Sequence, residues 1–222
     1  MSDGRAGSGS RMLAGNGAAL VRERALAGAV QNALERLYEL DRVVDVDAFV
    51  ARAESGERES LIVRESRDGA LEMSVRVPRL ARRAFDVTRD PDLDPLCQLI
   101  EGVSHFVYLA DRASAGRETT QLELELQAEV DKYVVLAASM EMFDLTASAA
   151  LRVRLYELVR FAHDEGSVLG ERYRVANRLA RSYTRRLERE YVAPRRYGAM
   201  RGELRRFYRM GQEGKLRLGR AV

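Results

Sequence analysis

The sequence predicts a mainly α (α+β) protein: an irregular bundle of about six helices with one β-hairpin packed on it. Apolar residues recur at steps of three and four over most of the 222 residues, as on one face of an amphipathic helix. Between residues 60 and 78 the period changes to two, which is typical of a strand with one buried face. No internal repeat or clear linker interrupts the chain, so we expect a single domain over 19–212.

Both ends of the chain are expected to lie outside this domain. Residues 1–18 hold five glycines and three serines, and this composition predicts a disordered N-terminal tail. Gly211, Gly214 and Gly219 interrupt the last residues, so we expect 213–222 to form a flexible C-terminal tail.

The first helix is predicted to begin near Ala19. A short second helix is expected to begin at Asp45 or Asp47, which can cap it, and to run through Phe49 and Val50. The apolar face of the first helix is formed by residues at helical spacing: Leu26, Val30, Ala33, Leu34, Leu37 and Leu40.

A hairpin is predicted to follow. Leu61, Ile62 and Val63 form one strand, and the second strand ends at Pro78. Asp68-Gly69 between them favours a tight turn, because glycine accepts a positive φ. The second strand alternates apolar and polar side chains, so its apolar row should point to one buried face: Leu71, Met73, Val75 and Val77.

Four or five further helices complete the predicted bundle. Thr120 and Glu123 form a capping box, so a helix should begin there. Leu122, Leu124 and Leu126 also alternate as in a strand, but the Glu, Leu, Gln and Ala content favours a helix. The remaining helices are expected at about 96–112, from Asp144 or Thr146 towards Gly166, at 168–192 and at 198–210.

Composition excludes several classes of protein. Hydrophobic residues make up 46% of the chain and charged residues 32%, which fits a folded domain and not a disordered chain. Cys97 is the only cysteine and cannot form an internal disulfide. No apolar run resembles a signal peptide or spans a bilayer, so we expect a cytoplasmic protein with no membrane partner.

Charge is distributed unevenly along the chain. Residues 152–222 hold 19 Arg or Lys and 8 Asp or Glu, a net charge of +11. The remaining residues hold 18 basic and 26 acidic side chains, a net charge of −8, and the two parts sum to +3. Only Lys132 and Lys215 are lysines, and such a bias towards arginine is typical of a GC-rich genome.

Four residues form the candidate for a metal site in the bundle: Glu101, His105, Glu129 and His163. Glu101 and His105 are four residues apart and share a helix face. Carboxylate-bridged metal sites use Glu-x-x-His, however, and this spacing differs. The alternative is that Gln98, Glu101, His105, Tyr108 and Arg112 form one solvated stripe, and that Glu123, Glu125, Glu129 and Asp131 line another. We therefore predict no cofactor.

Arginines and tyrosines interleave in residues 172–209. Arg174, Arg178, Arg181 and Arg185 recur at steps of four, three and four and therefore form one row. Such a row could neutralise phosphates, or it could pair with the acidic residues of 118–131. The candidate binding residues are Arg174, Arg178, Arg181, Arg185, Arg189, Arg195, Arg196, Arg205 and Arg206.

These patterns favour a non-catalytic interaction protein that uses its arginine-rich C-terminal third. The partner would be an acidic protein surface or a nucleic acid. No helix-turn-helix pattern is present, so nucleic-acid binding would be tolerant of sequence. The alternative is a helical metal-dependent enzyme with carboxylate and histidine ligands.

Overall fold

A computed structural model shows the arrangement of most of the chain. The expected N-terminal tail, residues 1–18, and the expected turn at Asp68-Gly69 lie outside the described residues. The residues that the structure describes are 20–54, 60–65, 71–80, 86–87, 89–90, 93–159 and 161–220.

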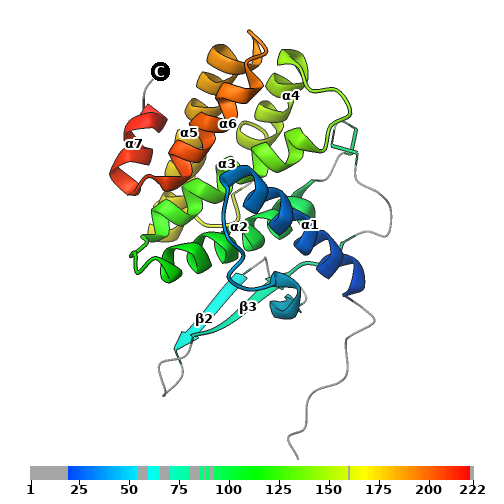
Figure 1. Cartoon of the computed structure of the whole chain (residues 1–222), viewed down its shortest axis with the longest axis vertical. Helices are drawn as coiled ribbons and strands as arrows, with labels where there is room; N and C mark the ends of the chain where they lie inside the picture. The colour runs from blue at the N-terminus through cyan, green and yellow to red at the C-terminus, as the bar shows by residue number, and fades with distance from the viewer. Residues whose placement is uncertain are drawn as a thin grey trace, which may run out of the picture.

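Seven α-helices dominate the described part of the chain, and the predicted mainly α fold is confirmed. Figure 1 shows α3 crossing the middle of the molecule, with the strands at one end and α5, α6 and α7 towards the other. None of the described helices is long and apolar enough to cross a membrane. The helices are α1 (Val21–Tyr38), α2 (Asp94–Ser114), α3 (Gln121–Ala138), α4 (Leu145–Tyr156), α5 (Val168–Leu187), α6 (Tyr197–Arg209) and α7 (Gln212–Arg220).

Short side-chain caps begin several of these helices. Thr120 accepts a hydrogen bond from the Glu123 amide, 3.2 Å away, which confirms the predicted start of α3. Asp144 caps α4 in the same way through the amide of Ala147. At the far end of α5 the chain continues into a π-helical segment, η3 (Glu188–Val192), before α6 begins.

The predicted hairpin is confirmed and carries one more strand than expected. Strands β2 (Ser60–Glu65) and β3 (Leu71–Val77) pair antiparallel, with Leu61 opposite Val75. Strand β1 (Val50–Arg52) pairs with β3 in parallel and completes a sheet of order β1-β3-β2. The predicted second helix is thus shorter than expected: a 3₁₀ helix, η2 (Val46–Phe49), ends where β1 begins.

The sheet packs on α2 through its apolar face. Val75 and Val77 are fully buried and belong to the core, as their alternation predicts. Strands β2 and β3 both contact α2. The side chains of Leu71 and Met73 lie outside the described part of the chain, so the rest of the predicted row stays a prediction.

The expectation of a flexible tail over 213–222 is wrong for the residues of α7. The helix packs on α5 and α3, and Lys215 is fully buried. Its Nζ donates to the Tyr108 hydroxyl at 2.8 Å and to Gln127 Oε1 at 2.7 Å. Gly219 lies so close to Leu179 that an added Cβ would be 2.9 Å from the leucine Cβ. The glycine therefore permits close packing of α7 on α5.

Asp131 lies in the same buried network and joins three helices. Its carboxylate accepts hydrogen bonds from Tyr38 of α1 at 2.5 Å, from Ser104 of α2 at 2.6 Å and from Gln127 of α3 at 2.8 Å. Burial raises the pKa of Asp131 to about 6, and these hydrogen bonds oppose the rise. The network connects both ends of the described chain to the centre of the bundle.

Replacing Lys215 with Met should change how stability depends on pH. Burial lowers the pKa of Lys215 to about 7, whereas an unfolded chain has a lysine pKa of about 10.4. Between these values the unfolded chain binds the proton and the folded protein does not, so stability rises with pH. We expect the free energy of unfolding of the wild type, relative to Lys215→Met, to increase from pH 7 to pH 9.5 in urea titrations.

Arg217→Met provides the matched control, because Arg217 is an exposed cation on the same helix. Its difference from the wild type should stay constant over this pH range. A constant difference for Lys215→Met as well would contradict the assignment of a buried, largely neutral amine.

Candidate functional site

The polar residues of α2 and α3 that were expected to lie in solvent are buried instead. Helix α3 contacts α1, α2, α4, α5 and α7, so protein surrounds all of its faces. Leu122, Leu124 and Leu126 signal this burial, because they put apolar side chains on more than one side of the helix. The buried polar residues, each at most 8% exposed, are Gln98, Glu101, His105, Tyr108 and Arg112 of α2 and Glu123, Glu125, Glu129 and Asp131 of α3.

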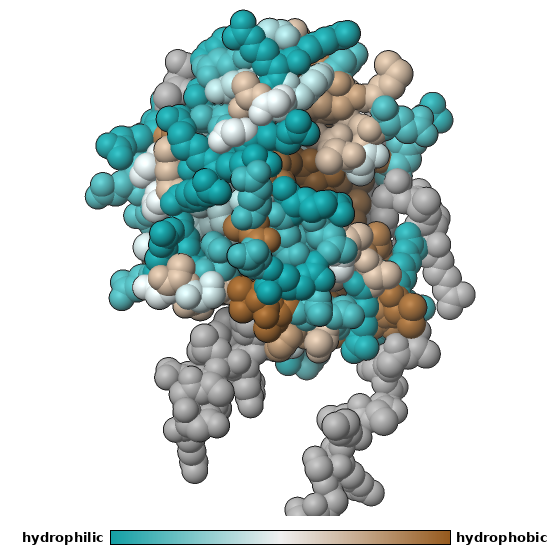
Figure 2. All heavy atoms as spheres, viewed as in Figure 1, coloured by the Kyte–Doolittle hydropathy of each residue, from teal (hydrophilic) through white to brown (hydrophobic). Residues whose placement is uncertain are grey.

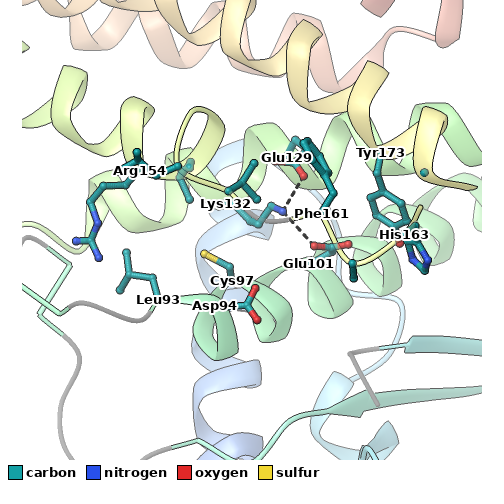
Figure 3. A pocket seen from close by; sticks show the side chains of 15 residues that line it. Leu93, Asp94, Cys97, Glu101, Glu129, Lys132, Arg154, Phe161, His163 and Tyr173 are labelled. Carbon is teal, nitrogen blue, oxygen red and sulfur yellow. Dashed lines mark hydrogen bonds and ion pairs between the residues drawn. The ribbon is translucent and has the colours of Figure 1, made fainter. Parts of the chain in front are cut away.

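Lys132 lies at the centre of one buried cluster. Its ammonium group donates to Glu129 Oε1 at 2.8 Å and to Glu101 Oε2 at 3.0 Å (Figure 3). Burial alone would lower the pKa of Lys132, but the two carboxylates raise it well above its ordinary value. The lysine is therefore a fixed cation between α2 and α3, and not a nucleophilic amine.

A second pair of contacts extends this cluster towards α5. His105 Nε2 lies 3.6 Å from Glu125 Oε2, and Arg172 Nε lies 3.6 Å from Glu125 Oε1. One ligand atom each of Glu101, His105 and Glu125 lies within 4.8 Å of the others. We call these three residues the Glu–His–Glu triad.

Both side chains of the His105–Glu125 pair are held close to neutrality. Burial, together with the negative charge of Glu101, raises the pKa of Glu125 to about 8. Burial likewise lowers the pKa of His105 below its ordinary value. A lowered pKa favours the uncharged form of the imidazole.

A cavity of about 560 Å³ adjoins the cluster and is lined by Glu101, Glu129 and Lys132. Figure 3 shows these side chains with Cys97 and Asp94 on one side and His163 and Tyr173 on the other. Three large apolar side chains that line the cavity are exposed: Leu158 at 70%, Val159 at 39% and Phe161 at 39%. The cavity therefore combines buried charged side chains with exposed apolar ones.

Cys97 is half-buried in this cavity. Burial raises the pKa of its thiol to about 12, and the nearby Lys132 only partly opposes the rise. The thiol is protonated at neutral pH and is a poor nucleophile.

The structure brings together only part of the candidate metal quartet. Glu101 and His105 converge with Glu125, which the sequence reasoning placed in a solvated stripe. Glu129 joins them only through Lys132. His163 lines the cavity and stacks on Tyr173 with ring centroids 5.3 Å apart. Within the described part of the chain, the Glu–His–Glu triad is the only group of three that could hold a metal ion.

The predicted arginine row lies on α5, and one of its four members differs from the rest. Arg178, Arg181 and Arg185 are exposed. Arg174 is half-buried and donates to the carbonyl oxygens of His163 and Asp164, so it braces the segment before α5. We refer to Arg178, Arg181 and Arg185 as the arginine row.

The other candidate arginines are also divided by burial. Arg205 is half-buried, donates to the Leu37 carbonyl at 2.7 Å and pairs with Glu39 at 2.7 Å. It fastens α6 to the end of α1. The exposed members are Arg189, Arg195, Arg196 and Arg206.

Internal pairing with residues 118–131 does not account for the arginine row. The acidic residues of α3 are buried, and Glu123 and Glu125 pair with Arg112 and Arg172. Within the described residues, Arg181 pairs with Glu157 at 3.0 Å, and neither Arg178 nor Arg185 forms an ion pair. The charge of the row therefore faces solvent.

Removing the Lys132 charge should strongly destabilise the protein. The side chains of Lys132, Glu101 and Glu129 are about nine-tenths buried, so Lys132→Met leaves carboxylates without their cation. Breaking a buried pair in this way costs about 3–5 kcal/mol. We expect a loss of that size in the free energy of unfolding from urea titrations at pH 7.

Adding Glu101→Gln and Glu129→Gln to Lys132→Met should recover part of the loss, because the uncompensated charges are then removed. Arg189→Met is the surface control, since its 3.3 Å pair with Glu190 is largely exposed and should matter little. A triple variant as unstable as Lys132→Met alone would contradict the electrostatic explanation.

Comparison with known proteins provides no match. No protein-family model, curated protein or solved structure matches this chain.

Proposed function

We propose that the protein binds nucleic acid through the exposed arginines of α5, η3, α6 and α7, without reading base sequence. The observation that supports this is an excess of exposed positive charge over these elements. Over residues 168–220, 11 arginines are exposed against two glutamates, Glu171 and Glu213. The exposed arginines are Arg178, Arg181, Arg185, Arg189, Arg195, Arg196, Arg201, Arg206, Arg209, Arg217 and Arg220.

The imbalance arises because other acidic side chains of this region point inward. Glu188 is buried, accepts a hydrogen bond from Ser148 and pairs with Arg152 at 2.9 Å. Glu203 is buried and pairs with Arg186. Glu188 and Glu203 lower the net charge of this region, but they are buried and do not offset the exposed arginines at the surface.

The arginine row has a spacing that suits a phosphate backbone. Arg178, Arg181 and Arg185 are three and four residues apart, which corresponds to a rise of about 10 Å along α5. One strand of a duplex carries a phosphate about every 3.4 Å of axis, so the row covers about three phosphates. Contacts of this kind fix the position of a nucleic acid but carry no sequence information.

A nucleic acid suits this surface better than an acidic protein does. Protein interfaces depend on apolar or aromatic anchors that become buried in the complex. On α5, α6 and α7 the exposed large apolar side chains are Val168 and Tyr197, at the first turns of their helices. Figure 2 shows that hydrophilic residues predominate where α6 and α7 face the viewer.

Replacing the arginine row with glutamine should weaken binding and flatten its salt dependence. Each phosphate contact contributes about 0.7–0.9 to the slope of log K against log salt concentration. The Arg178→Gln, Arg181→Gln, Arg185→Gln variant should therefore lose about 2–3 from the magnitude of that slope. The measurement is fluorescence anisotropy with labelled single-stranded RNA, single-stranded DNA and duplex DNA between about 50 and 300 mM salt.

A charge-matched control separates a local surface from an effect of net charge. Arg24, Arg36 and Arg117 are exposed and lie outside α5–α7, so changing these three to glutamine removes the same charge elsewhere. Equal losses in the two triple variants would contradict the proposed surface, as would no binding by the wild type at low salt. Binding of polyglutamate as tight as that of RNA would favour an acidic protein partner and overturn the nucleic-acid proposal.

A further inference from the structure

The Nε2 atom of His105 is buried and lacks a hydrogen-bond partner among the residues that the structure describes. The residue as a whole is 8% exposed. Glu125 Oε2 is 3.6 Å from this nitrogen, which is too far for a hydrogen bond. Buried polar atoms are usually hydrogen-bonded, and this one faces carboxylates, so a ligand between the imidazole and the carboxylates would satisfy it.

We propose that Glu101, His105 and Glu125 bind one divalent transition-metal ion. The three ligand atoms lie within 4.8 Å of one another. Ligands about 2.1 Å from a tetrahedral metal are about 3.4 Å apart, so small side-chain rotations would bring these atoms into place. Three protein ligands leave a coordination position for water or a bound molecule.

Neighbouring cations hold the two carboxylates in position. Lys132 donates a hydrogen bond to Oε2 of Glu101. Arg172 lies next to Oε1 of Glu125, and Oε2 of Glu125 lies next to His105. Partners of this kind orient metal ligands in many sites.

The ligand types favour some metals over others. One imidazole and two carboxylates suit Zn²⁺, Mn²⁺ or Fe²⁺, whereas Mg²⁺ and Ca²⁺ prefer oxygen ligands alone. Glu101 belongs to the Glu–His–Glu triad and also lines the cavity, so a bound ion would lie next to that cavity. The molecule that enters the cavity would be small, with an oxygen atom that can bind the ion at one end and an apolar part at the other.

Metal binding can be measured on the full chain, purified without a histidine tag and freed of metal by chelation and dialysis. Isothermal titration with Zn²⁺ and with Mn²⁺ should show one ion per chain for at least one of them. His105→Gln and Glu125→Gln should each weaken that binding at least tenfold. His163→Gln is the matched control, because His163 is the only other histidine and lies outside the triad.

A second measurement on the wild type keeps the test valid if a triad variant fails to fold. With ¹⁵N-labelled histidine, the added metal should shift the ring nitrogen signals of His105 and leave those of His163 in place. No binding of either metal, or equal loss in His163→Gln, would overturn the proposal. Unchanged His105 signals at saturating metal would also overturn it. Nucleic-acid binding is measured separately, so the two proposals can fail independently.

Discussion

Burial of charged side chains on α3 is the constraint on which the rest of the structure depends. A charged group removed from water is tolerated only when it is paired and hydrogen-bonded. Helix α3 buries Glu123, Glu125, Glu129, Asp131 and Lys132, and each of them contacts a polar or charged side chain of another helix or of α3 itself. These contacts connect α3 to α1, α2 and α5. Lys215 of α7 donates a hydrogen bond to Gln127 of α3. The bundle is therefore held by specific pairs as well as by its apolar core.

This inward use of acidic side chains also shapes the outer surface. The chain has a net charge of only +3. Many of its carboxylates are buried and contact other side chains in α2, α3 and α5–α6. Arginines with no such partner remain outside, and Arg178 and Arg185 are examples. The charged cluster inside and the basic surface outside are thus two results of one distribution of charge. They also support different proposals: the buried cluster supports a metal site, and the basic surface supports nucleic-acid binding.

Sequence reasoning succeeded where the cause is local. The Thr120 cap, the period-two alternation ending at Val77 and the helix spacing all depend on residues close together in the chain. Features that depend on a residue far away in the chain could not be predicted from the sequence. Nothing near Glu125 reveals that Arg172 will face it, and nothing near Lys215 reveals Tyr108. The same reason explains why β1 was missed, because its three residues form a strand only by pairing with β3.

The charge states of the two lysines test this account most directly. The chain has no other lysines, so ¹⁵N-lysine NMR resolves each side-chain nitrogen across a pH titration. Lys132, between two carboxylates, should stay protonated well above the ordinary lysine pKa of about 10.4, whereas Lys215, with neutral hydrogen-bond partners, should titrate near pH 7. Lysines that both titrate at the ordinary value of about 10.4 would show that these groups are solvated, and would contradict a bundle organised by buried charge.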